Sequence, residues 1–121
     1  IPMFQTMKIC KDNMMHACLH GFINATDLAD YLTKKGLPFR DAYHIVGQIV
    51  GYGIENKKSL NELSLKEYKK FHASFEEDVY QYIDIETCVN NRKVYGGPSP
   101  ESVSIQIQNI EDFIKQEACY E

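Results

Sequence analysis

The chain has 121 residues, of which 44% are hydrophobic, and a formal net charge of −4 at pH 7. This length suits one domain with its own buried core, and the hydrophobic content excludes a disordered chain. The acidic balance argues against a nucleic-acid partner, and the lack of an apolar run of about 18 residues argues against a membrane span.

The four cysteines are Cys10, Cys18, Cys88 and Cys119. An even number could indicate disulfides, but a domain of this length does not need them, and the first residues lack the layout of a secretory leader. We therefore expect free, mostly buried thiols and a cytoplasmic protein. Because the chain begins with Ile1 and not with methionine, we also expect it to be excised from a longer protein.

Helical patterns begin near the N-terminus and continue along nearly the whole chain. The first apolar stripe at helical spacing consists of Met3, Met7, Cys10, Met14 and Cys18. Residues 6–9 could be extended, and we expect a helix from about Lys11 to Leu19.

A second helix is predicted after Asn24, whose side chain can cap the first turn, with the Asp27 carboxylate three residues later. Leu28 and Leu32 share its apolar face, and Gly36 suits the left-handed position that follows a helix.

Pro38 fits the first turn of a third helix, where its missing N–H costs nothing. The apolar stripe of this helix consists of Ala42, Ile45, Val46, Ile49, Val50 and Ile54. Gly47 and Gly51 each cost about 1 kcal/mol in a helix interior, so we expect a neighbouring helix to approach the backbone closely there.

Three Ser-x-x-Glu patterns, each typical of a capping box, follow at Ser59/Glu62, Ser64/Glu67 and Ser74/Glu77. They predict short helices near residues 65–71 and 75–83, and Asp84 can cap another helix over residues 85–91.

Gly96-Gly97-Pro98 predicts a turn, after which Ser99 can cap a last helix that starts with Pro100. Residues 103–107 alternate and would suit a strand, but the later period favours a helix. Its apolar face comprises Val103, Ile107, Ile110 and Ile114, with Phe113 beside them. The sequence thus predicts a compact all-α, multi-helix, single domain over residues 1–121.

His16 and His20 stand four residues apart, on either side of Cys18, which is the helical spacing of a two-histidine zinc site. The metalloprotease pattern requires glutamate after the first histidine, where this chain has Ala17, and no second cluster offers further ligands. We interpret the pair as surface histidines and predict no metal site.

Paired carboxylates such as Glu76, Glu77 and Asp78 could act in acid–base catalysis, but these three also fall where a helix N-terminus favours negative charge. We prefer the second interpretation. Cys88 has no histidine beside it in sequence and is expected to be buried rather than nucleophilic.

The remaining polar candidates also have structural explanations. Lys57 and Lys58 would offset a helix dipole, and Asn90-Asn91-Arg92 would end a helix. Tyr80 and Tyr82 would pack between helices rather than stack on bases, since acidic residues lie beside them. Gly96-Gly97 is too short for a phosphate loop.

Residues 21–40 follow the pattern GF-x-x-ATDLADYL-x-x-KG-x-PFR, which resembles the C-terminal domain of argininosuccinate lyases. Further matching segments lie in the same order and spacing at residues 63–65, 75–79, 89–92 and 96–101. Two positions depart from the family pattern. Tyr43 stands where the family commonly has histidine, with His44 one place later, and Asn91 replaces the usual alanine.

This resemblance implies an all-α fold and a homotetrameric parent enzyme, a carbon–nitrogen lyase that splits argininosuccinate into arginine and fumarate by β-elimination. The family's catalytic serine lies on a GSS-x-MP-x-K-x-N loop that this sequence does not contain. We therefore assign no catalytic and no cofactor-binding residue, and we expect the chain alone to be inactive.

The expected partners are the rest of the parent subunit and tetramer, with argininosuccinate bound by the parent only. Residues 1–10 would connect to a missing central helical domain. The alternative is a free-standing helical interaction module, whose apolar patch would include Met3, Phe4 and Met7.

Overall fold

The computed structural model describes residues 2–118, which form helices and connecting segments and contain no β-strand. The predicted all-α class is confirmed. None of the helices within residues 2–118 is long and apolar enough to cross a membrane. The chain divides into two compact units, one ending at Ile83 and the other beginning at Asp84. The prediction that residues 1–121 form a single domain is not tested by this division and stays a prediction.

The N-terminal segment contains two helices, α1 (Pro2–Thr6) and α2 (Lys11–His20), separated by non-helical residues 7–10. The predicted helix over Lys11 to Leu19 is therefore confirmed to within one residue, whereas α1 was not predicted. Neither helix contains a buried residue. The apolar stripe through residues 3–18 consequently contributes nothing to the core of the described chain.

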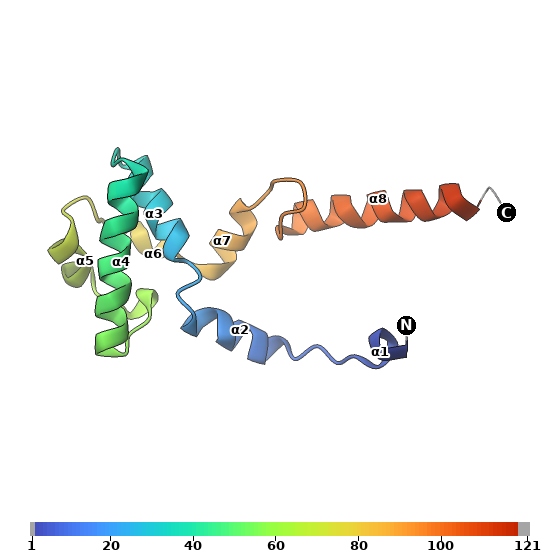
Figure 1. The fold of residues 1–121 in the computed structure, drawn as a ribbon, viewed down its shortest axis with the longest axis horizontal. Helices are drawn as coiled ribbons and strands as arrows, with labels where there is room; N and C mark the ends of the chain where they lie inside the picture. The colour runs from blue at the N-terminus through green and yellow to red at the C-terminus, as the bar shows by residue number, and fades with distance from the viewer. Residues whose placement is uncertain (1, 119–121) are drawn as a thin grey trace. The chain divides into compact units, whose positions relative to one another are not determined.

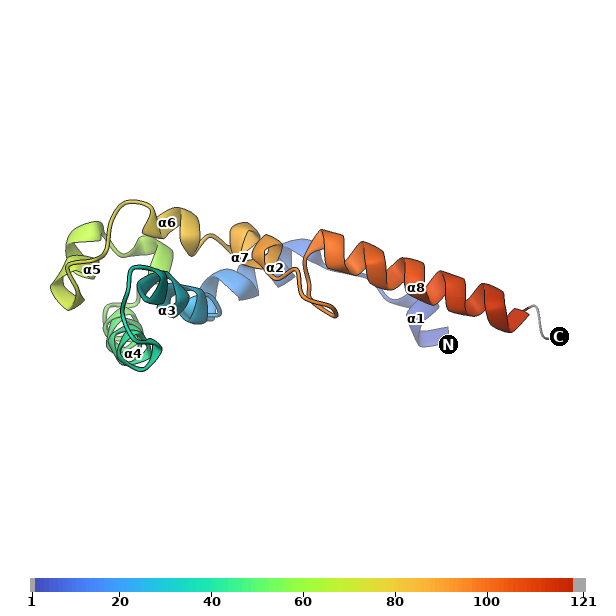
Figure 2. The ribbon, with the colours of Figure 1, turned by 90° about the horizontal axis from the view of Figure 1, so that it is seen from above.

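Helices α3 (Ala25–Lys34) and α4 (Phe39–Asn56) lie side by side and form the centre of the first unit (Figures 1 and 2). Leu28 and Leu32 from α3 are fully buried, as is Ile49 from α4. The backbone turns out of α3 at Gly36, whose φ of +102° is open to glycine without strain, as predicted.

Asn24 precedes α3 as predicted, but its side chain does not cap the helix. The side chain is buried and donates to the carbonyl oxygen of Ile83 at 2.8 Å. The capping prediction is wrong because a buried amide must find hydrogen-bond partners, and a carbonyl far along the chain supplies one. Pro38 likewise stands just before α4 and not in its first turn.

The predicted apolar stripe of α4 is confirmed only in part. Ala42 and Val46 are buried, but the Ile54 side chain is 63% exposed. The prediction of a close neighbour at Gly47 and Gly51 is wrong within residues 2–118, where a Cβ atom at either position would meet no atom within 4 Å. The glycine of α4 that other atoms approach closely is Gly53.

The first unit continues with a 3₁₀ turn, η1 (Leu60–Glu62), and the short helices α5 (Leu65–Phe71) and α6 (Val79–Tyr82). Ser59 and Ser64 begin η1 and α5 as predicted, and each donates its backbone N–H to the glutamate three residues later at 2.7 Å. The third predicted box is wrong, because α6 begins only at Val79. The fully buried side chains of this region are Leu60, Leu63, Tyr68, Phe75, Val79 and Ile83.

The second unit contains α7 (Ile85–Asn91) and α8 (Pro100–Ala118). Both caps are confirmed: Asp84 accepts a hydrogen bond from the Thr87 N–H at 2.9 Å, and Ser99 accepts from the Ser102 N–H at 3.2 Å. Residues 103–107 are helical, so the strand alternative is excluded. The predicted turn includes Gly96, with φ of +79°.

The cysteines follow the prediction only partly. Cys10 and Cys18 are free thiols, of which the first is exposed and the second half-buried. Cys88 is buried as expected. Cys119 lies outside the described residues.

Candidate functional site

His16 and His20 lie on one side of α2, with their Nε2 atoms 3.1 Å apart. Both rings are exposed, and one imidazole can donate a hydrogen bond to the other. Across residues 2–118, no three or more His, Cys, Asp or Glu side chains gather in a way that could hold a metal ion.

Two members of the acidic triplet, Glu76 and Asp78, contact the end of α3, and the triplet precedes α6 instead of lying within it. Lys35 pairs with Glu76 and, at 3.2 Å, with Asp78. The Tyr31 hydroxyl donates to Asp78 Oδ1 at 2.5 Å and accepts from the Glu76 backbone N–H at 3.2 Å. The predicted placement in the first turn of a helix is wrong, since Asp78 is the N-cap residue of α6 and the other two precede it. Glu76 and Asp78 hold this segment against the end of α3.

The electrostatics of this cluster follow from the same contacts. The hydrogen bond from Tyr31, assisted by Lys35, lowers the pKa of Asp78. Burial, and then the bond to Asp78, raises the pKa of Tyr31, so its hydroxyl stays protonated and keeps donating. A carboxylate stabilised in its charged form and a phenol kept neutral are suited to structure rather than to proton transfer at neutral pH.

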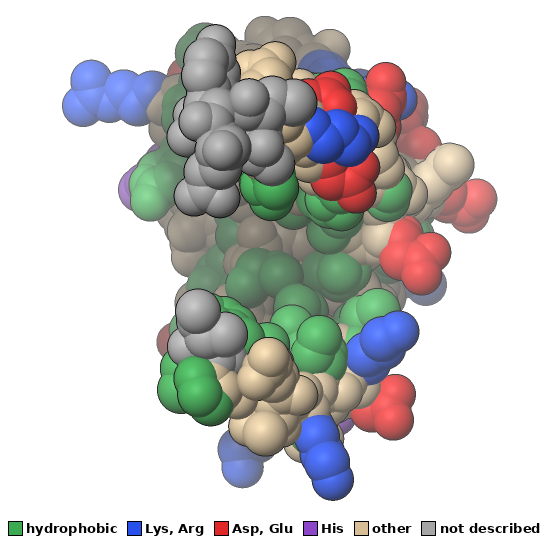
Figure 3. Space-filling model, turned by 90° about the vertical axis from the view of Figure 1, so that its right-hand side faces the viewer, with side chains coloured by type: hydrophobic (Ala, Val, Ile, Leu, Met, Phe, Trp, Pro, Cys, Tyr) green, Lys and Arg blue, Asp and Glu red, His purple; other side chains and the backbone are tan. Residues whose placement is uncertain are grey.

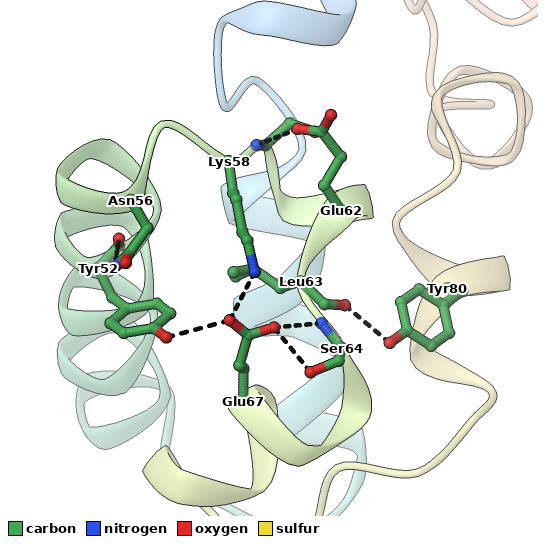
Figure 4. A network of polar contacts seen from close by, with 9 residues as sticks. Tyr52, Asn56, Lys58, Glu62, Leu63, Ser64, Glu67 and Tyr80 are labelled. Carbon is green, nitrogen blue, oxygen red and sulfur yellow. Dashed lines mark hydrogen bonds and ion pairs between the residues drawn. The ribbon is translucent and has the colours of Figure 1, made fainter.

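Glu67 is the centre of a second network, which joins α4 to α5 (Figure 4). One carboxylate oxygen accepts from Lys58 Nζ at 2.8 Å and from the Tyr52 hydroxyl at 3.0 Å. The other accepts from the N–H and from the hydroxyl of Ser64, both at 2.7 Å. These donors, Lys58 first and Ser64 next, lower the pKa of Glu67 to about 2.

From the Glu67 network we predict that the fold becomes less stable at acidic pH. A carboxyl whose pKa is lower in the folded than in the unfolded chain stabilises the fold above its ordinary pKa of 4.5, and that contribution is lost as the pH falls towards about 2. We expect Glu67→Gln to have a lower urea midpoint of unfolding than the wild type above pH 4.5. We also expect its midpoint to fall less than that of the wild type when the pH is lowered. Urea unfolding at both ends of this pH window measures the effect.

Glu55, an exposed glutamate on α4, provides the matched control for this prediction. Glu55→Gln should keep the acid sensitivity of the wild type. An equal reduction in both variants would contradict a specific role of the Glu67 network.

Several other candidates also have structural partners. Lys58 follows the end of α4 and pairs with Glu67, while its effect on the helix dipole stays a prediction. Lys57 closes α4 in the left-handed conformation with φ of +53°. Arg92 donates to the Cys88 carbonyl at 3.0 Å and thereby helps to end α7, in line with the structural interpretation. Tyr80 donates to the Leu63 carbonyl at 2.8 Å.

Tyr82 is half-buried, and its ring packs edge-on against that of Tyr31 at 5.5 Å between centroids. Asn90 and Asn91 are exposed near the end of α7. The buried or paired roles of Asn24, Tyr31 and Tyr52 were missed, because their partners lie 15 to 59 residues away in sequence and no local pattern signals them.

Two helices expose apolar faces that the described chain leaves uncovered. The α4 outer face consists of Phe39, Tyr43, Gly47, Gly51 and Ile54, all exposed. The α8 seam consists of Val103, Ile107, Ile110 and Ile114, which are 41% to 60% exposed. The predicted apolar side of α8 therefore meets solvent, as do the N-terminal residues Met3, Phe4 and Met7. Figure 3 shows hydrophobic side chains at the surface beside acidic and basic ones.

A solved structure shares this helical fold. A variant of EDDS lyase with bound fumarate matches with a TM-score of 0.85 at 23% identity, over 91% of this chain and 24% of that one. The fold is therefore one that a known lyase contains.

Sequence comparisons are more specific. The family model described as argininosuccinate lyase C-terminal matches residues 22–90. The chain is 61% identical over 112 residues to the argininosuccinate lyase of Caldicellulosiruptor bescii, covering 93% of the chain and 24% of that protein. It is 53% identical over 114 residues to the argininosuccinate lyase of Clostridium beijerinckii, covering 94% of the chain and 25% of that protein. The chain belongs to the argininosuccinate lyase C-terminal family, and it spans about a quarter of the length of these relatives.

Proposed function

We propose that this chain is the C-terminal part of an argininosuccinate lyase, an enzyme that cleaves argininosuccinate to arginine and fumarate by β-elimination in arginine biosynthesis. The observation that carries the proposal is the 61% identity to such an enzyme over 93% of the chain. The parent is a cytoplasmic homotetramer in this proposal, and it alone binds the substrate.

The role of the chain within this parent is structural. Its polar clusters support that role, because the carboxylates of Glu67 and Asp78 are engaged by donors that hold the fold together. The catalytic groups belong to the other three quarters of the enzyme. The domain completes the subunit and supports the wall of the active site, while the isolated chain is inactive.

Reconstitution tests this proposal. The Caldicellulosiruptor bescii enzyme would be produced without its matching C-terminal quarter, and this chain would then be added. We expect fumarate release, followed by ultraviolet absorbance, to rise about tenfold or more above either piece alone, because mispositioned catalytic groups lose rate on that order.

The controls are each piece alone and the intact enzyme, with circular dichroism to establish that both pieces are folded. Unchanged activity after mixing two folded pieces would contradict the proposal and would favour the free-standing interaction module. Activity in this chain alone would contradict its non-catalytic role.

A further inference from the structure

The α4 outer face lacks the charges that normally cover an exposed helix. Residues 42–54 contain no Asp, Glu, Lys or Arg. A helix that meets water on one side usually carries polar or charged residues there, whereas a helix that is apolar all round is buried in the assembled protein. In the described chain, however, the Tyr43 and Ile54 side chains are 67% and 63% exposed.

The exposed positions are spaced to receive another helix. Tyr43, Gly47 and Ile54, together with the half-buried Val50, follow the spacing i, i+4, i+7, i+11 and so share one side of α4. This side extends for about 16 Å along the helix axis, given a rise of 1.5 Å per residue. A seam of this period packs against a second helix, and not against an extended strand, which needs the free edge of a sheet.

Gly47 and Gly51 have no side chains, so they leave the helix backbone uncovered in the middle of this side. Each glycine is unfavourable in a helix interior, and nothing in the described chain lies within 4 Å of where its Cβ would be. Small residues one turn apart let the backbone of a second helix approach closely, which offsets the loss. The described chain thus contains Gly47 and Gly51 without the close helix contact that would offset their cost.

A hollow of about 320 Å³ adjoins Gly47. Its lining residues are Phe22, Ala25, Thr26, Tyr43, Val46, Gly47 and Val50. None of them is charged, so the hollow suits an apolar side chain and would penalise a charged one.

We propose that the α4 outer face is the docking surface for an α-helix from the remaining three quarters of the lyase, with an apolar side chain of that helix filling the hollow. The inference rests on the proposed function. The occupant follows from length: the chain accounts for 24% of its relative, so most of the protein lies outside this structure and can supply the helix. The absence of charge along residues 42–54 fits a permanent internal contact better than an exchangeable partner.

Binding between this chain and the complementary part of the Caldicellulosiruptor bescii enzyme tests the docking surface. Gly47→Leu places a bulky side chain in the middle of the face, while Gln48→Leu places the same side chain at the next position, which is also exposed. Titration calorimetry should show binding weakened about tenfold or more by Gly47→Leu and changed by less than about twofold by Gln48→Leu. Thermal melts of the chain alone should show that Gly47→Leu stays folded, because no atom of the described residues lies within 4 Å of the added Cβ.

The outcomes separate this inference from the proposed function. Equal binding by wild type, Gly47→Leu and Gln48→Leu, with activity restored, would overturn the docking surface and leave the lyase assignment intact. No binding by the wild-type chain would overturn both. Self-association of the wild type that Gly47→Leu abolishes, without any effect on binding to the complementary part, would make a second copy the occupant and would also overturn the inference.

Discussion

Alanine in place of Tyr68 is expected to remove about 3–5 kcal/mol from the free energy of unfolding, the usual result of deleting a buried aromatic ring. Tyr68 is fully buried and is the buried residue through which α5 joins the core. Its ring centroid lies 5.0 Å from that of Phe75 and 6.2 Å from that of Tyr80. Urea unfolding followed by circular dichroism measures the loss.

Two further substitutions separate the ring from its hydroxyl. Tyr68 donates to the carbonyl oxygen of Leu60 at 2.7 Å, and this bond is buried. Tyr68→Phe keeps the ring but leaves the carbonyl without that donor, which should cost about 1–3 kcal/mol. Tyr43→Phe, at an exposed tyrosine, should change stability by less than about 0.5 kcal/mol. If Tyr68→Ala were no worse than Tyr68→Phe, packing of the ring would not be what holds α5.

The sequence predicted those elements whose signals are local. The helices α5 and α7 have the predicted bounds, because each begins with a hydrogen bond between residues three apart. The Ser64 N–H donates to the Glu67 carboxylate, and the Thr87 N–H donates to the Asp84 carboxylate. The last helix begins at Pro100 for the same reason. A capping pattern needs no knowledge of tertiary structure, so it can be read from one sequence.

Predictions failed where a distant partner competed for the same side chain. Asn24 donates to Ile83 instead of capping α3, and the Lys58 ammonium group pairs with Glu67 on α5, which no local pattern indicated. Residues 76–78 are held by Tyr31 and Lys35 and so do not enter a helix. A Ser-x-x-Glu pattern is weak evidence when the intervening residues can be held elsewhere more firmly.

The exposed faces illustrate a different limit. The periodicity of α4 and of the last helix identifies apolar sides, but it does not say whether this chain or another part of the protein covers them. Ile54 and Ile107 are both more than half exposed despite their regular spacing. The proposed function would supply the missing context, because a domain of a larger assembly, taken alone, presents as surface what the assembly would bury.

Alanine at Gly53 is expected to destabilise the chain by about 1–3 kcal/mol, although alanine is the better helix former. A Cβ atom there would lie 2.8 Å from the Lys58 carbonyl oxygen and 3.1 Å from the ring of Phe22. The Lys58 backbone cannot simply withdraw, since its N–H donates to the Gly53 carbonyl at 2.9 Å and closes the end of α4. Steric overlap therefore outweighs helix propensity at this position.

The same helix offers the matched comparison. Gly47→Ala and Gly51→Ala add the same methyl group where no atom of residues 2–118 lies within 4 Å, so each should stabilise the isolated chain by about 0.5–1 kcal/mol. One substitution in one helix thus has opposite signs, decided by whether backbone oxygen or open space faces the new atom. Thermal melts of the three variants measure this. If all three variants, Gly53→Ala included, melted above the wild type, the prediction would be contradicted. The turn after α4 would then relax freely, and the close approach of Lys58 would not constrain the helix end.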